Sequence, residues 1–277
     1  MNILVTLNSG YVYPLTIMLR SLMAANPGEK FTVYVAHSSL TPNDFAQIRS
    51  GTDFSRCRIV GIAVSDSLFG SMPCKNRLSK ETYYRLYAAE FLPAEVDRIL
   101  YLDPDIVING SLGELYNIDF KGRFFAAASH NGFFLNRINK RRLKMDRNSF
   151  YVNAGVIMIN LNALRKADMT PKLLEYLSQN SGRLFLEDQD VFNALYSADT
   201  LYIDPEKFNM DELTFKRLTR KIGHKKAMDF VEENMVIIHF NGKDKPWNEN
   251  YKGKLGGFFE KNLGGRKNIC SLYKEVI

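Results

Sequence analysis

Residues 98–107 read RILYLDPDIV, an apolar strand pattern that runs directly into two aspartates. Side chains two positions apart on an extended backbone point to the same side, so Asp103 and Asp105 should face one point at the end of the strand. Pro104 keeps Asp103 extended and prevents a helix from starting there. Two carboxylates this close repel each other unless a cation lies between them, and Mg²⁺ and Mn²⁺ both accept oxygen ligands and bridge diphosphates. A solvated Asp-Pro-Asp turn is the structural alternative.

The chain before this segment alternates between strand and helix patterns. Strands are predicted at 2–7, 31–36, 58–63 and 98–102. Helices are predicted at 13–25, from Pro42 after an N-cap at Thr41, and at 79–91 with Ser79 as N-cap. Beyond the segment, strands are predicted at 124–128, 156–161 and 235–239, and a helix at 188–196. This order is typical of an α/β fold with a mostly parallel central sheet and helices on both faces, whose carboxyl edge binds ligands.

The composition is that of a globular protein. The chain has 277 residues, of which 45% are hydrophobic and 24% charged, which excludes a disordered chain, a collagen and a coiled coil. Three cysteines without a CxxC pair argue against a disulfide scaffold or zinc ribbon and favour a reducing compartment. The N-terminus lacks a signal-peptide pattern, and no apolar run approaches the ~18 residues of a spanning helix. We therefore expect a cytoplasmic protein, at most peripheral on the inner face of a membrane.

The net charge of +7 is concentrated in 137–147, in 215–226 and in the tail after Lys243. Such patches attract phosphate, nucleic acid or anionic lipid. No zinc finger, RNA-recognition signature or basic zipper accompanies them, so nucleic acid is not an expected partner. The tail mixes lysines with Phe258, Phe259 and Tyr273. It could lie on an anionic membrane surface, or it could be a C-terminal helix packed on the protein.

A second motif, VIIHFNGKDKPW at 236–247, places a histidine at the end of a buried strand. Gly242 allows close backbone approach to a ligand, and Lys245 is a suitable point charge for a phosphate. Trp247, the only tryptophan, is either part of the core or the anchor of a lid. His239 alone would usually be a satisfied polar group, but its neighbours here favour a ligand role near a metal diphosphate.

Three weaker motifs complete the pattern. LEDQDVFN at 186–193 holds more acidic groups than helix capping needs, and carboxylates and amides bond sugar hydroxyls well. FYVNAGVI at 150–157 places Asn-Ala-Gly before an apolar strand, which indicates a close approach to another group. TLNSGY at 6–11 occupies the turn after the first strand, a usual nucleotide position, but it lacks the GxGxxG fingerprint.

Together, YLDPD, FYVNAG, LEDQDVFN, HFNGKDKPW and the helix TYYRL at 82–86 resemble glycosyltransferase family 8. This family includes bacterial lipopolysaccharide galactosyl- and glucosyltransferases and glycogenin. The resemblance implies a GT-A fold, the Rossmann-like fold of nucleotide-diphospho-sugar transferases, over 1–247. A basic helical extension at 248–277 would then pack on or beside this catalytic domain. It also implies Mn²⁺, with Mg²⁺ as the alternative, and a UDP-hexose donor.

The resemblance also implies residue roles. Asp103, Asp105 and His239 match the metal ligands. The positions matching contacts to the nucleotide, the diphosphate and the donor sugar are Leu7, Asn8, Tyr11, Pro104, Asn153, Ala154, Gly242 and Lys245. The catalytic positions would be Arg85, Asp188, Gln189 and Asp190. The chain departs from the family in three places, with Asn8-Ser9 in place of aspartates, His130 in place of an aspartate and Leu186 in place of an aromatic residue.

The implied reaction is transfer of galactose or glucose to a hydroxyl of a glycan or lipid-linked sugar, as in lipopolysaccharide biosynthesis, with retention and an α-linkage. Retention requires either a protein nucleophile, Asp190 or Gln189, or front-face attack, which we favour because a neutral amide is a poor nucleophile. Two alternatives remain. DPDIV also fits the DxDx[TV] pattern of haloacid-dehalogenase-like phosphatases, and the chain could be an inactive nucleotide-sugar binding protein.

Overall fold

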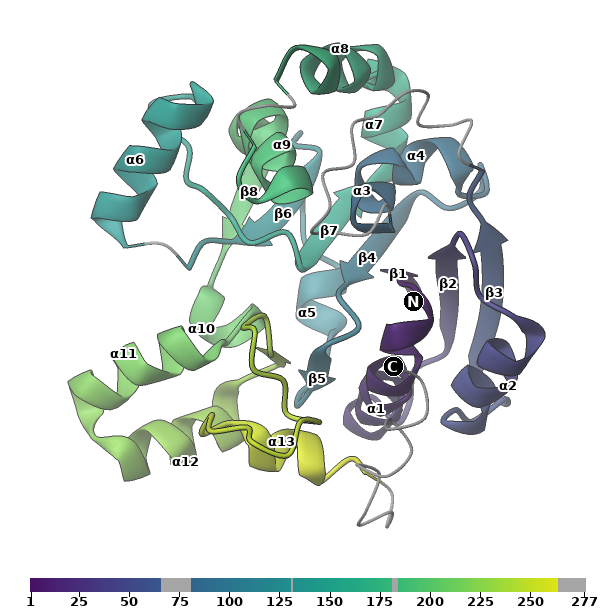
Figure 1. Cartoon of the computed structure of the whole chain (residues 1–277), viewed down its shortest axis with the longest axis vertical. Coiled ribbons are helices and arrows are strands. Elements are labelled where there is room, and N and C mark those ends of the chain that lie inside the picture. The colour runs from purple at the N-terminus through teal and green to yellow at the C-terminus, as the bar shows by residue number, and fades with distance from the viewer. Residues whose placement is uncertain (66–80, 131, 181–183, 264–277) are drawn as a thin grey trace.

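The computed structural model describes residues 1–65, 81–130, 132–180 and 184–263 (Figure 1). Its main sheet has seven strands in the order β3-β2-β1-β4-β7-β6-β8. These are β1 (Asn2–Thr6), β2 (Phe31–His37), β3 (Cys57–Ala63), β4 (Arg98–Leu102), β6 (Phe125–Ala128), β7 (Val156–Asn160) and β8 (Thr200–Ile203). The strands β3, β2, β1 and β4 are mutually parallel, and β6 is parallel to β8. The predicted mostly parallel α/β sheet is therefore confirmed.

Strand β7 is the exception, because it runs antiparallel to both of its neighbours, β4 and β6. The sequence predicted this strand but not its direction. Reversing β7 brings its first residues beside the carboxyl end of β4, where the Gly155 carbonyl accepts a hydrogen bond from the Asp103 N–H at 2.8 Å. The Asn-Ala-Gly segment therefore meets the first aspartate directly.

The helices of the first half follow the predicted order. Thr41 and Asp44 form a capping box at the start of α2 (Pro42–Ser50), which follows α1 (Val12–Ala25) and β2. The continuous helix predicted at 79–91 is wrong. It is divided into α3 (Glu81–Tyr84), η3 (Arg85–Tyr87) and α4 (Ala88–Phe91), and the Arg85 side chain itself takes the Thr82 carbonyl that a regular helix would use. The Ser79 N-cap lies outside the described residues.

A second, two-stranded sheet pairs β5 (Ile106–Ile108) antiparallel with β9 (Ile237–His239), with Ile106 opposite His239. The remaining elements surround the two sheets. They are η1 (Ser9–Tyr11), α5 (Gly113–Tyr116), α6 (Phe133–Leu143), α7 (Leu161–Ala167), α8 (Thr170–Asn180), α9 (Glu187–Tyr196), η4 (Ser197–Asp199), α10 (Pro205–Phe208), α11 (Glu212–Ile222), α12 (His224–Asn234) and α13 (Gly256–Glu260). The predicted late strand thus exists, but it lies outside the main sheet.

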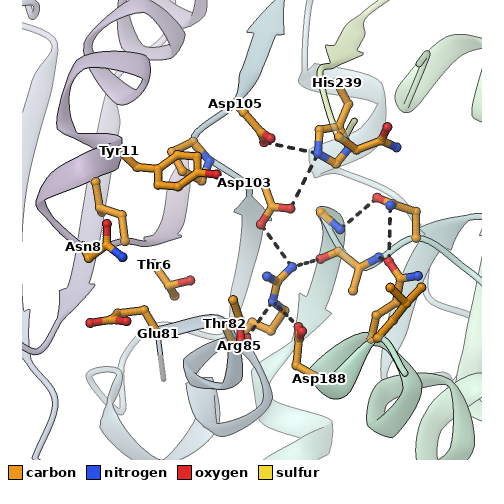
Figure 2. Close-up of a pocket in the computed structure, with 18 residues that line it drawn as sticks. Thr6, Asn8, Tyr11, Glu81, Thr82, Arg85, Asp103, Asp105, Asp188 and His239 are labelled. Carbon is orange, nitrogen blue, oxygen red and sulfur yellow. Dashed lines mark hydrogen bonds and ion pairs between the residues drawn. The ribbon is translucent and has the colours of Figure 1, made fainter. Parts of the chain in front are cut away.

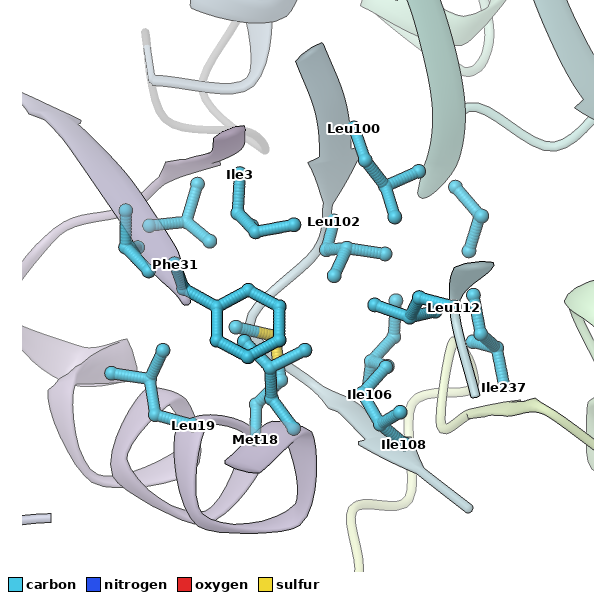
Figure 3. Packing of buried hydrophobic residues seen from close by; sticks show 14 of the residues in the cluster. Ile3, Met18, Leu19, Phe31, Leu100, Leu102, Ile106, Ile108, Leu112 and Ile237 are labelled. Carbon is cyan, nitrogen blue, oxygen red and sulfur yellow. The ribbon is translucent and has the colours of Figure 1, made fainter. Parts of the chain in front are cut away.

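One hydrophobic cluster joins the two sheets (Figure 3). Ile3 and Leu102 of the main sheet, Met18 of α1, and Ile106 and Ile237 of the small sheet are all at most 1% exposed. Burial of each such side chain contributes roughly 1.5–3 kcal/mol. This packing fixes β9, and with it His239, against the end of β4.

The C-terminal part of the described chain packs on α1. Phe258 and Phe259 of α13 are 4% and 2% exposed, and the Phe259 ring lies 6.4 Å from that of Tyr13. Trp247 lies between Tyr11 and Phe259, at centroid distances of 6.1 and 5.7 Å. The two tail phenylalanines are thus packed within the protein, and the domain boundary after Trp247 stays a prediction. Among the described residues, no helix is both long and apolar enough to cross a membrane.

Candidate active site

A cavity of about 400 Å³ opens at the carboxyl ends of β1 and β4 (Figure 2). Most of the residues predicted for the site line it: Leu7, Asn8, Tyr11, Arg85, Asp103, Pro104, Asp105, Asn153, Ala154, Asp188, Gln189 and His239. Asp190, Gly242 and Lys245 are not in its lining. Glu81 lines the cavity although no sequence pattern indicated it, and Asn241 lines it from within the motif at 236–247.

The two aspartates and the histidine meet at one point of this cavity. His239 Nε2 lies 3.3 Å from Asp105 Oδ1 and 3.6 Å from Asp103 Oδ2, and one ligand atom from each residue lies within 4.8 Å of the others. Asp105 Oδ1 and His239 Nε2 are both buried without a hydrogen-bond partner. Buried polar atoms are normally satisfied, so a divalent cation fits this donor set of two carboxylates and one imidazole.

The charges of Asp103, Asp105 and His239 shift one another's pKa values. Burial by itself would lower the pKa of His239, but the carboxylates of Asp105 and Asp103 outweigh it and raise that pKa to about 9. Burial would likewise raise the pKa of Asp105, but His239 and Lys245 hold it below its usual value. Without a cation, a proton on His239 therefore supplies the positive charge that the aspartates require.

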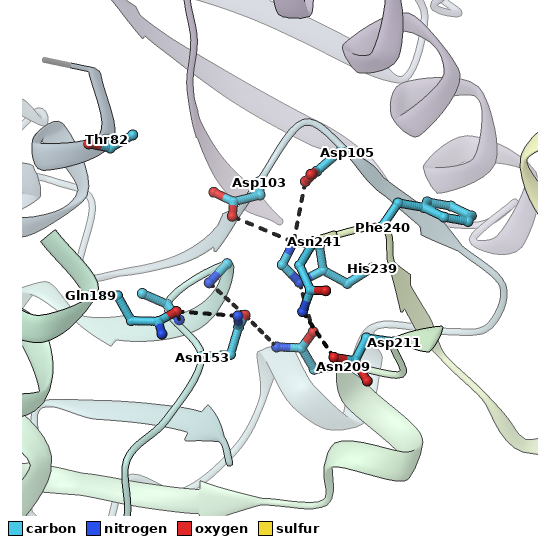
Figure 4. A network of polar contacts seen from close by, with 12 residues as sticks. Thr82, Asp103, Asp105, Asn153, Gln189, Asn209, Asp211, His239, Phe240 and Asn241 are labelled. Carbon is cyan, nitrogen blue, oxygen red and sulfur yellow. Dashed lines mark hydrogen bonds and ion pairs between the residues drawn. The ribbon is translucent and has the colours of Figure 1, made fainter. Parts of the chain in front are cut away.

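Asn209, fully buried at the end of α10, orients the histidine (Figure 4). Its Nδ2 donates to Asn153 Oδ1 at 3.0 Å, which turns its Oδ1 toward His239 Nδ1 at 2.9 Å. An acceptor at this place requires His239 Nδ1 to donate its proton, and Nε2 is then left to face the two aspartates. No local sequence signal could have found Asn209, because its role depends only on tertiary contacts.

Gly155 explains the close approach predicted for the Asn-Ala-Gly segment. A Cβ atom at this position would lie 2.2 Å from His239 Cε1 and 2.5 Å from Asp103 Oδ2. Real Cβ atoms do not approach other atoms so closely. Only glycine leaves room here for the histidine ring and the first aspartate.

Arg85 joins two carboxylates on the other wall of the cavity. The side chain is 7% exposed, with Nη1 3.1 Å from Asp103 Oδ1 and Nε 3.0 Å from Asp188 Oδ2. It also donates to the Ala154 carbonyl and lies over the Tyr101 ring. Burial raises the pKa of Asp188 to about 6 despite the neighbouring guanidinium. The motif TYYRL thus supplies a fixed positive charge to the cavity.

Comparison with known proteins agrees with this geometry. The sequence model of glycosyl transferase family 8 matches residues 2–251. The chain belongs to glycosyltransferase family 8. It is therefore a glycosyltransferase, and this assignment leaves the phosphatase alternative without support.

This family 8 member is similar to several named proteins. It is 28% identical to a lipopolysaccharide 1,2-glucosyltransferase of Escherichia coli, over 88% of this chain and 72% of the relative. It is 26% identical to a lipopolysaccharide 1,3-galactosyltransferase of Salmonella typhimurium, over 89% of this chain and 72% of that protein. The crystal structure of the galactosyltransferase LgtC with donor and acceptor sugar analogues superimposes with a TM-score of 0.80 at 24% identity, covering 99% of both chains. The GT-A fold is thereby shown.

In this glycosyltransferase the acidic motif at 186–193 divides into two roles. Gln189 Oε1 accepts from the Ala154 N–H at 3.0 Å and from Asn153 Nδ2 at 3.3 Å, so it braces the cavity wall. Asp190 is fully buried behind that wall. Its carboxylate accepts two hydrogen bonds from Arg142, at 2.7 and 2.8 Å, and one from Tyr151 at 2.8 Å. It also accepts from two backbone N–H groups at the start of α9, which are structural contacts.

Two further predicted positions lie beside the cavity of the glycosyltransferase. Lys245 Nζ donates to Asp105 Oδ2 at 2.5 Å and to the Phe240 carbonyl at 2.8 Å. A Cβ at Gly242 would make only an ordinary contact with the Asp244 carbonyl oxygen, at 3.9 Å. His130, expected from the resemblance to stand where some relatives carry an aspartate, lies with Nδ1 3.3 Å from Asp211 Oδ2 and Nε2 2.5 Å from the Asn209 carbonyl. His130 therefore helps to hold the backbone of Asn209 in place.

Proposed function

We propose that this protein transfers glucose or galactose from a UDP-linked donor to a hydroxyl of a glycan or lipid-linked sugar, with retention and an α-linkage. The observation that carries the proposal is the cluster of Asp103, Asp105 and His239 in the cavity at the carboxyl ends of β1 and β4. The named lipopolysaccharide glucosyl- and galactosyltransferases among its relatives support the hexose and the glycan acceptor.

The donor set favours Mn²⁺, because an imidazole ligand suits manganese better than magnesium, which prefers oxygen alone. When bound, the cation would neutralise the negative charge that builds on the departing diphosphate. Lys245 forms an ion pair with one oxygen of Asp105. Its charge would also help to neutralise the departing diphosphate. Asn209 keeps His239 Nε2 directed at the two aspartates.

The other residues that line the cavity would form two groups, one that binds the nucleoside and one that binds the donor sugar. Leu7, Asn8 and Tyr11 follow β1 and would hold the nucleoside, with Asn8 Oδ1 fixing the turn through the Gly10 N–H at 3.1 Å. Asp188 and Asn153 offer oxygen and amide groups for sugar hydroxyls. A buried carboxylate at Asp188 would also stabilise positive charge that develops on the anomeric carbon.

Front-face attack is the route to retention that these contacts support. Asp190 is fully buried, and both of its oxygens are occupied by Arg142, Tyr151 and backbone N–H groups. Gln189 is a neutral amide whose oxygen already accepts two hydrogen bonds. With neither Asp190 nor Gln189 available as the nucleophile, the acceptor hydroxyl attacks from the side that the diphosphate leaves, and a diphosphate oxygen takes its proton.

The test is a calorimetric titration of UDP with and without Mn²⁺. We expect binding that depends on the metal and that weakens by more than about tenfold in Asp103→Asn and in Asp105→Asn. Asp229→Asn, an exposed aspartate on α12, is the matched control and should bind as the wild type does. Equal binding in EDTA, or unchanged binding in both site variants, would contradict the proposal. Slow hydrolysis of UDP-glucose against UDP-galactose then identifies the donor sugar.

A further inference from the structure

Helix α6 carries apolar side chains that nothing in the described part of the chain covers. Phe134, Leu135 and Ile138 are 72%, 47% and 46% exposed. Residues three and four apart on a helix are neighbours, so Ile138 lies next to both of the others and the three form one cluster. A soluble surface rarely groups large apolar side chains in this way without a partner.

The same helix is strongly basic. Residues 132–147 contain Arg137, Lys140, Arg141, Arg142, Lys144 and Arg147, against a single acidic residue, Asp146. Arg137, Arg141, Lys144 and Arg147 are exposed. The first of the basic segments noted in the sequence is therefore a surface on which positive charge surrounds exposed apolar groups. We call Phe134, Leu135, Arg137, Ile138 and Arg141 the α6 surface.

The α6 surface is continuous with the rim of the cavity. Along the helix the row Leu135, Ile138 and Arg142 leads to Phe185, whose ring lies 4.9 Å from the Arg142 guanidinium. Phe185 is 77% exposed. The next residue, Leu186, is 51% exposed and lines the cavity. Figure 1 shows α6 at the periphery of the molecule, at the upper left beyond α9.

The anchoring of α6 makes this surface rigid. Arg142 is held by both oxygens of the buried Asp190, and Asn136 Oδ1 accepts from the Tyr151 N–H at 2.8 Å. Leu143 and Met145 pack against Tyr151. The inner side of α6 is thus held against the protein by these contacts. Its outer side therefore has a fixed position beside the cavity.

We propose that the α6 surface docks on an anionic lipid bilayer, with the Leu186 rim of the cavity beside the lipid. Basic side chains attract anionic headgroups, while phenylalanine, leucine and isoleucine insert at the headgroup boundary. A nucleic acid would use the charges but not the aliphatic side chains. A second copy related by a two-fold axis would oppose arginine to arginine. This docking goes beyond the proposed transfer reaction and requires neither donor nor metal.

The experiment is co-sedimentation of the full chain with vesicles of phosphatidylcholine alone and of phosphatidylcholine mixed equally with phosphatidylglycerol, at low salt. We expect binding only to the anionic vesicles. Arg137→Glu with Arg141→Glu should weaken it by more than about tenfold, and Phe134→Ser with Ile138→Ser by a similar factor. The fold and the slow hydrolysis of the UDP-sugar should stay unchanged in both variants, because these side chains are exposed and outside the cavity.

Matched controls lie at the opposite edge of the sheet, near β3. Phe54→Ser removes an equally exposed phenylalanine, at 70%, and Arg49→Glu with Arg58→Glu makes the same change of charge. Both controls should bind as the wild type does. The proposal is overturned if the wild type ignores anionic vesicles, if neutral vesicles bind equally, or if the α6 and control variants behave alike. Loss of oligonucleotide binding in the α6 variants, without vesicle binding, would replace the bilayer by nucleic acid.

Discussion

At the scale of single residues, Asn209 connects His239 of the candidate metal site to Asn153 in the cavity wall. Its Oδ1 faces His239 and its Nδ2 donates to Asn153. We expect Asn209→Ala to weaken Mn²⁺ binding in the presence of UDP by about 10–100-fold, because the imidazole loses its orienting acceptor. Calorimetry measures this change directly. Removing a buried partner should also cost about 1–3 kcal/mol of folding free energy.

Asn26→Ala separates these two effects. Asn26 is also buried, and its Oδ1 accepts from the Leu112 N–H at 2.9 Å, in a region that does not line the cavity. We expect a similar loss of stability from this control with unchanged metal affinity. If both variants bind Mn²⁺ equally well, Asn209 is only a structural residue.

The protonation of His239 should make stability depend on pH when no metal is bound. Its folded-state pKa, about 9, lies above the roughly 6.5 of an unfolded chain. A raised histidine pKa stabilises the folded state fully below about pH 6.5, and this contribution is lost as the pH rises toward about 9. We expect denaturation in EDTA to show a fall on the order of 3 kcal/mol across this range. His239→Gln should abolish it, and an equal slope in that variant would refute the assignment.

At the scale of elements, the pairing of β7 with β4 decides whether the site can form. The reversed direction of β7 places Gly155 against Asp103 and His239, where an added Cβ would overlap the His239 ring. We expect Gly155→Ala to displace His239, to weaken metal binding by more than about tenfold and to cost about 1–3 kcal/mol of stability. Gly28→Ala is the control, because a Cβ at Gly28 meets nothing within 4 Å. Unchanged metal affinity in Gly155→Ala would contradict this prediction, because it would show that the added methyl group is accommodated without displacing His239.

The elements also show what the sequence could and could not predict. The apolar runs that end at Asp103 and at His239 mark two strand ends, because in each case the buried strand and the polar site residue are adjacent in the sequence. The direction of β7 and the separate pairing of β5 with β9 depend on contacts between distant segments, which no local pattern encodes. Asp190 shows the same limit, since its hydrogen bonds from Arg142 and Tyr151 depend on contacts between distant segments.

At the scale of the whole molecule, the candidate metal site of Asp103, Asp105 and His239 joins two parts of the chain. Asp103 and Asp105 follow β4 of the main sheet, whereas His239 ends β9, which packs with α11, α12 and α13. A ligand that binds only when both parts are in place stabilises the entire fold by mass action. At about a hundredfold excess over its dissociation constant, this stabilisation is about 2.7 kcal/mol. We expect Mn²⁺ with UDP to raise the melting temperature by about 5–10 °C.

The variant Asp105→Asn tests whether Mn²⁺ and UDP stabilise the protein by binding at Asp103, Asp105 and His239. The asparagine keeps the size of the side chain but removes one of the two negative charges that face His239. We expect its melting temperature to be insensitive to Mn²⁺ and UDP, while EDTA leaves it folded. A shift as large as that of the wild type would mean that the ligands bind away from Asp105. A shift from Mn²⁺ alone, lost in the variant, would mean that the two parts of the chain already form the metal site before the nucleotide arrives.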